Sequence, residues 1–185
     1  TVVVHLHAIE ILAHLVRKEF LQEFNSLLES CTNIRWTSVN YYKPGAELAN
    51  AVNDSLRKKT DVNVVFLQNH GVVIGGENIE EVDDILKTLI DKLSTVPRKK
   101  NCINPPESPL LITENIKFLP VTDHSVHQLA VDTFLFEHLE TDWALYPDHV
   151  VFLGTYANRY ESYELLCSEL SNGAHIPELI FLRGI

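Results

Sequence analysis

The sequence has 185 residues, of which 45% are hydrophobic and 22% are charged, as in ordinary globular proteins. This length is enough for one large domain or two small ones, each with a buried core. The net charge of −10 argues against a nucleic-acid partner, and so does the lack of a Lys/Arg-rich stretch with aromatic residues between the basic ones. The apolar runs are too short to cross a membrane and no signal peptide is recognisable, so we expect a cytoplasmic protein with no membrane partner.

Two histidines stand at the end of the first predicted strand. The run Val2 to Val4 is β-branched and reads as a buried strand, which continues through His5 and His7. Successive side chains of a strand point to opposite faces, so these two imidazoles lie on the same side. Such a pair is half of a metal site, although a strand with a satisfied polar edge has the same pattern.

The next elements alternate between helix and strand. Apolar residues at helical spacing predict a long amphipathic helix over about 8–29, which one break could divide. His14 lies off its apolar face, so we expect it at the solvent or in a subunit contact. A loosely alternating strand follows over 34–42, and a helix over 46–58 comes after Pro44.

A second apolar strand, over 62–68, ends close to His70. If this strand brings its end to the same edge of the sheet as the first strand, three imidazoles meet there. Three nitrogen ligands suit zinc with an open position, as in catalytic rather than structural sites. A short strand over 72–74 follows, and Asn78 is placed to cap a helix that reaches residue 93.

The composition changes after this helix. Residues 96–109 are rich in proline and lack apolar periodicity, and we interpret them as a linker between a domain over 1–95 and a second domain over 110–185. For the second domain we predict strands near 110–112, 116–120, 150–153 and 179–182, with helices over about 124–140 and 161–170. It is therefore expected to be a small α/β domain.

Two features of the second domain are weaker site candidates. His124 and His127 share a helix face, but no third ligand stands near them, so two solvated histidines are the alternative. Asp148 and His149 follow Tyr146-Pro147, where a ligand-binding loop competes with a simple proline turn. The three cysteines, Cys31, Cys102 and Cys167, are widely spaced and form no CxxC, which favours free thiols in a reducing compartment.

Three motifs together resemble the class II aldolase/adducin family. They are VVVHLHA at residues 2–8, YYKPGAELANAV at 41–52 and VVFLQNHGVVIGGENIEEV at 64–82, in the same order and at similar spacing as in that family. The resemblance implies an α/β fold with a mainly antiparallel central sheet flanked by helices. It also implies zinc, or another divalent metal, on His5, His7 and His70.

The resemblance further implies a function. It favours a zinc-dependent lyase of the aldolase type, which cleaves a carbon–carbon bond of a sugar or sugar phosphate through a metal-stabilised enediolate. The alternatives are an epimerase, dehydratase or decarboxylase with the same metal site, or a non-catalytic adducin-like binding module. Family members commonly form homo-tetramers. Their catalytic glutamate and phosphate-binding loops precede the HxH strand, where this sequence begins, so catalytic and substrate-binding residues stay unassigned and the domain is expected to lack its N-terminal part.

Overall fold

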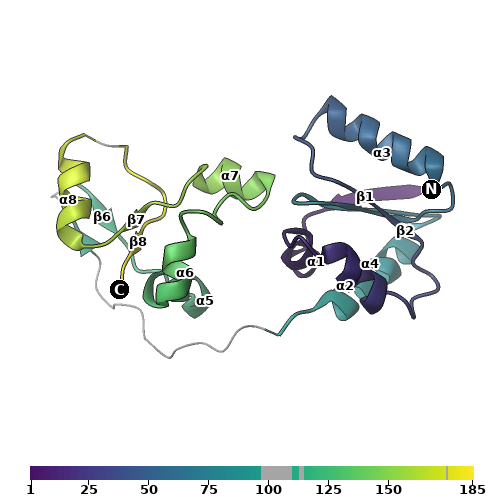
Figure 1. Ribbon diagram of the computed structural model, residues 1–185, viewed down its shortest axis with the longest axis horizontal. Coiled ribbons are helices and arrows are strands. Elements are labelled where there is room, and N and C mark those ends of the chain that lie inside the picture. The colour runs from purple at the N-terminus through teal and green to yellow at the C-terminus, as the bar shows by residue number, and fades with distance from the viewer. Residues whose placement is uncertain (97–109, 113–114, 174) are drawn as a thin grey trace. The chain divides into compact units, whose positions relative to one another are not determined.

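A computed structural model of the chain describes residues 1–96, 110–112, 115–173 and 175–185 (Figure 1). The chain divides into two compact units, Thr1–Val96 and Pro97–Ile185. The linker predicted over 96–109 lies outside the described residues, apart from Val96. Among the described residues, no helix combines the length and the apolar character that crossing a lipid bilayer requires.

The first unit is built on a four-stranded sheet. Its strands are β1 (Val2–Leu6), β2 (Trp36–Val39), β3 (Val64–Leu67) and β4 (Gly71–Gly76), in the order β1-β4-β3-β2. β4 runs antiparallel to both of its neighbours, whereas β2 runs parallel to β3 because helix α3 (Ala46–Lys58) carries the chain between them. The predicted α/β class is confirmed, and the sheet is mixed, with two antiparallel pairings and one parallel pairing.

Helices cover both faces of this sheet (Figure 1). The alternation of β3 explains the arrangement, since Val64 and Phe66 pack into a core with α1 (Ile9–Leu15), α2 (Phe20–Leu27) and α4 (Ile79–Leu93), whereas Val65 and Leu67 pack with α3. Every residue of β3 is buried. The central strand that leads to His70 is therefore held from both sides.

The predicted helix over 8–29 is two helices, and the break between them explains a wrong prediction for His14. His14 is buried, because its Nδ1 lies 2.5 Å from Glu23 Oε2 and its Nε2 donates to the carbonyl of Leu93 at 3.0 Å. The imidazole thus links α1, α2 and the end of α4. Helical periodicity alone does not reveal such a contact, because it depends on how α2 turns back.

Replacing Glu23 with glutamine is expected to lower the free energy of unfolding at pH 7 by about 1–2 kcal/mol, because the partly exposed carboxylate is the partner of a buried imidazole. The hydrogen bond from His14, and after it the one from Arg17, outweighs burial and holds the pKa of Glu23 below its ordinary 4.5. Because the pKa of this carboxyl is lower in the folded chain than in the unfolded chain, its ionisation stabilises the fold at pH values above the ordinary pKa. This stabilisation is lost as the pH falls through the pKa of the folded chain.

Urea unfolding at pH 7 and at successively lower pH measures this effect. The difference between wild type and Glu23→Gln should shrink as the solution is acidified below pH 4.5. Glu29→Gln, at an exposed position of the same region, is the control and should change little. Equal stabilities of wild type and Glu23→Gln at pH 7 would show that the link between His14 and Glu23 contributes nothing.

The second unit is small and has short strands. β5 (Leu110–Leu111) pairs with β6 (Lys117–Phe118), and β7 (Arg159–Tyr160), which we did not predict, pairs with β8 (Phe181–Leu182). The helices of its described part are α5 (His124–Val131), α6 (Thr133–His138), α7 (Pro147–Leu153) and α8 (Tyr163–Ser171).

The strand predicted over 150–153 is wrong, because these residues belong to α7. Pro147 is the first residue of this helix, where the fixed φ of proline suits the helix and its missing N–H costs nothing. A short apolar run such as Val150 to Leu153 fits a buried strand and a helix equally well, so the periodicity could not decide between them.

Candidate metal centre

Pairing between β1 and β4 brings the three predicted ligands together. The register places Leu6 opposite Val72, so the end of β1 lies beside the start of β4, and His70 immediately precedes β4. A three-residue turn, residues 68–70, joins β3 to β4, and Asn69 adopts a left-handed φ of 52° within it. Asparagine is one of the few residues that enter this region readily, which accounts for its place before the histidine.

The three histidines form a compact cluster. One potential ligand atom from each of His5, His7 and His70 lies within 4.8 Å of the others. The ring centroids are 4.8 Å apart for His5 and His7, 5.0 Å for His5 and His70, and 5.2 Å for His7 and His70. Within the described ranges, this is the one group of three or more His, Cys, Asp or Glu side chains that could hold a metal ion.

A backbone carbonyl orients one of the rings. His5 Nδ1 donates a hydrogen bond to the carbonyl oxygen of Val72 at 3.1 Å, since a carbonyl can only accept. In a neutral ring this leaves the lone pair on Nε2, which lies 3.1 Å from Nε2 of His7. Metal-binding histidines are commonly fixed in this way through their second nitrogen. The sequence did not single out Val72, because the acceptor belongs to its backbone, and only the strand register reveals it.

The three histidines of the cluster differ in their exposure to solvent. His70 is buried, with 8% of its surface exposed, whereas His7 is half-buried and His5 is exposed. A solvent molecule or a substrate can therefore approach His5, in β1, and His7, which directly follows β1. Partial exposure is what a catalytic metal site with an open position needs.

The geometry of the cluster suits a tetrahedral ion after modest adjustment. Zinc–nitrogen bonds of about 2.0–2.1 Å place the nitrogens of two ligands roughly 3.3 Å apart. The nitrogens of His5 and His7, 3.1 Å apart, already have this spacing. The outer limit of 4.8 Å for the whole cluster exceeds the spacing of roughly 3.3 Å around a zinc ion, so the side chains must rotate inward to bind one.

The histidines of the second unit do not form a comparable site. His124 is exposed, in agreement with a solvated histidine, whereas only 6% of His127 is exposed. Burial, with a smaller contribution from His124, lowers the pKa of His127. His127 Nε2 is buried without a hydrogen-bond partner among the described residues. His149 packs against Trp143 with ring centroids 4.3 Å apart, and burial lowers its pKa as well. Asp148 lies in the first turn of α7 and His149 follows it in the same helix, so these two residues do not form the ligand-binding loop that we considered.

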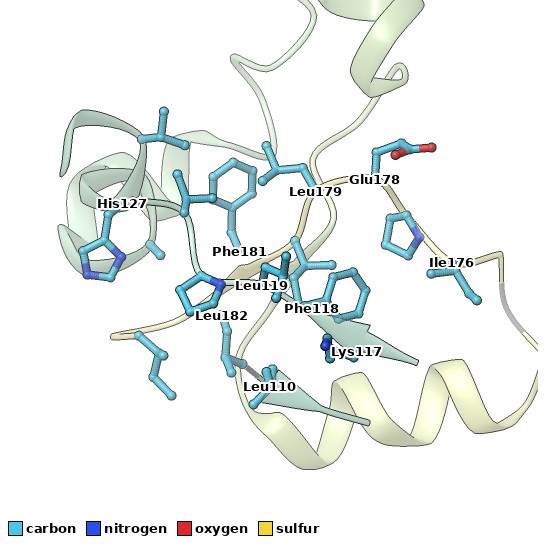
Figure 2. Close-up of a pocket in the computed structure, with 17 residues that line it drawn as sticks. Leu110, Lys117, Phe118, Leu119, His127, Ile176, Glu178, Leu179, Phe181 and Leu182 are labelled. Atoms are coloured by element: carbon cyan, nitrogen blue, oxygen red, sulfur yellow. The ribbon is translucent and has the colours of Figure 1, made fainter. Parts of the chain in front are cut away.

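A cavity of about 460 Å³ lies elsewhere, in the second unit (Figure 2). Its walls are mostly apolar side chains from β6, α5 and the segment around β8, such as Phe118, Val126 and Phe181. Polar groups in its lining come from Lys117, His127 and Glu178. A single buried imidazole is not a metal-ligand set, so we place the candidate centre at the three histidines of the first unit and not at this cavity.

The cysteines are not part of the centre either. Cys31 is buried in the first unit and Cys167 is partly buried in the second, and both are free thiols. Cys102 lies outside the described residues.

One known protein family matches the first unit of the chain. Residues 1–90 match the family model described as Class II Aldolase and Adducin N-terminal domain. No curated protein and no solved structure matches the chain significantly. The matched range contains the whole four-stranded sheet and all three clustered histidines. The similarity to the class II aldolase and adducin N-terminal domain family thus covers residues 1–90 of the 185-residue chain.

Proposed function

We propose that His5, His7 and His70 bind a divalent metal ion, most simply zinc, and that the protein is a metal-dependent lyase of the class II aldolase type. The observation that carries this proposal is the convergence of three imidazoles from two separate segments at one edge of the sheet. Three imidazole nitrogens gathered in this way can act together as ligands of one metal ion.

Each residue has a definite task in this proposal. His70 supplies a ligand from the most buried position, at the end of a strand that is packed on both faces. His5 and His7 supply ligands from the accessible side, and the carbonyl of Val72 keeps His5 Nδ1 protonated so that Nε2 faces the ion. When bound, the ion supplies a Lewis acid that stabilises negative charge on the oxygens of the substrate.

The proposed substrate is a sugar or sugar phosphate, and the proposed reaction is cleavage of a carbon–carbon bond beside a carbonyl group. The family includes aldolases, and three neutral nitrogen ligands leave the net positive charge of the ion available to substrate oxygens. We assign no general base and no substrate-binding residue among the residues of this chain.

Activity of the full-length natural protein tests the proposal. After loading with zinc, it should release an aldehyde or ketone product from at least one member of a panel of ketose and aldose phosphates. The release should stop when a chelator removes the metal and return when zinc is added back. Metal binding with isomerised, dehydrated or decarboxylated products would instead assign another reaction of the same site. Absence of metal binding would favour a non-catalytic adducin-like module.

A further inference from the structure

The first residue of β4, Gly71, lies against the strand that carries two of the three histidines. If a methyl group replaced its hydrogen, the new carbon would lie 2.5 Å from the carbonyl oxygen of Leu6. It would also lie 2.7 Å from Cδ2 of the His7 ring and 3.3 Å from Cε1 of the His5 ring. The first two separations are well inside van der Waals contact, so no side chain fits without movement.

The atoms in the way belong to the candidate centre or to its support. Leu6 is the residue between His5 and His7, and its carbonyl is backbone, so it moves only if β1 moves with it. The alternative is rotation of the His7 ring. Either movement displaces ligand nitrogens, and metal–ligand distances tolerate deviations of only about 0.2 Å.

The requirement for glycine here is one of space and not of backbone conformation. Among the described glycines, positive φ values occur at Gly45, Gly154, Gly173 and Gly184, and Gly71 is not one of them. Alanine at position 71 would therefore carry no dihedral penalty of the left-handed kind. Its effect would come from the contacts with Leu6 and His7.

We propose that Gly71 is a positioning residue of the metal centre, a role that rests on the proposed metal binding by the three histidines. Its missing side chain lets β1 approach β4 closely enough for His5 and His7 to meet His70. The tripeptide from residue 70 to residue 72 then makes three contributions in sequence. His70 is a ligand, Gly71 provides the space for the facing histidines, and the carbonyl of Val72 orients His5.

The same strand offers a matched control. Gly75 also lies in β4 and is paired with Val3 of β1. A methyl group there would come no closer than 4.0 Å to the carbonyl of Val2 and to a side-chain carbon of Val3, which is ordinary contact. Gly75→Ala therefore makes the same chemical change, in the same strand and beside the same neighbour, without the collision.

Zinc affinity and cobalt spectra of the 185-residue chain test the proposal. Competition with a chromophoric chelator should give Gly75→Ala an affinity within about threefold of wild type, and Gly71→Ala an affinity lowered by about tenfold or more, the range found when groups supporting metal ligands are lost. The visible absorption of bound Co²⁺, which reports ligand geometry, should change in Gly71→Ala and not in Gly75→Ala. Unchanged affinity and spectrum in Gly71→Ala would overturn the inference. Failure of wild type to bind either ion would instead overturn the proposed metal site.

A second comparison, made without metal, covers the case in which Gly71→Ala unfolds. Replacing His7 with alanine removes the ring that lies 2.7 Å from the added methyl group. Thermal unfolding should then show a smaller loss of stability from Gly71→Ala in the His7→Ala background than in wild type. An equal loss in both backgrounds would mean that Gly71 serves the sheet and not the histidine cluster, and would overturn the inference.

Discussion

Replacing His70 with alanine is expected to lower zinc affinity by more than about 100-fold, because even loss of a group that merely supports a ligand costs 10–100-fold. His70 is the most buried of the three histidines and comes from a different segment than His5 and His7. The two remaining imidazoles are fewer than the three or four protein ligands that zinc sites use. Titration of the metal-free chain with zinc, in competition with a chelator of known affinity, measures the effect.

His175→Ala is a suitable control for this titration. His175 is exposed in the second unit, and its replacement should leave zinc affinity within about twofold of wild type. His14→Ala would be a poor control, since His14 is hydrogen-bonded inside the first unit and its loss would disturb the fold. An affinity for His70→Ala equal to that of wild type would contradict the three-histidine site.

The second large effect is expected in the core beneath the site. Phe66 is fully buried at the centre of β3, with ring centroids 4.4 Å from Phe24 and 5.6 Å from Trp36. Phe66→Ala should lower the free energy of unfolding of the first unit by about 3–5 kcal/mol, through lost burial and the cavity that remains. Since domains are stable by only about 5–15 kcal/mol, this loss should leave the unit close to its unfolding threshold.

Urea unfolding followed by tryptophan fluorescence measures this loss, because Trp36 lies against the Phe66 ring. Leu21→Ala provides the comparison, as Leu21 belongs to α2 of the same unit but is 40% exposed. It should cost less than about 1 kcal/mol. Similar losses of unfolding free energy for Phe66→Ala and Leu21→Ala would show that the packing of Phe66 against Phe24 and Trp36 is not the main core of this unit.

Local rules predicted part of the three-histidine cluster, and the resemblance to the class II aldolase/adducin family implied the complete set. Alternation along β1 put His5 and His7 on one side, and the apolar strand before His70 identified a second segment that a sheet could bring to the same edge. Alternation also separates the two faces of β3, which carry the two cores of the first unit. The shared side of His5 and His7 and the two faces of β3 follow from the period of a strand, whereas the meeting of these histidines with His70 depends on the pairing of β1 with β4.

The features that sequence reasoning missed depend on contacts between distant segments. The burial of His14 depends on α2 turning back and on the end of α4, which lies 79 residues away at Leu93. The acceptor for His5 is a backbone carbonyl, which a sequence does not display. The helix at Pro147–Leu153 was mistaken for a strand because four apolar residues in a row fit either structure. The demand for space at Gly71 appears only once the β1–β4 register is known.

X-ray absorption at the zinc edge tests the central claim most directly. With one equivalent of zinc bound to the wild-type chain, the spectrum should show nitrogen ligands at about 2.0–2.1 Å with the multiple scattering of imidazole rings, fitted by three histidines. His70→Ala should lose one imidazole contribution. A first shell containing sulfur at about 2.3 Å, or one without imidazole scattering, would contradict zinc binding by His5, His7 and His70.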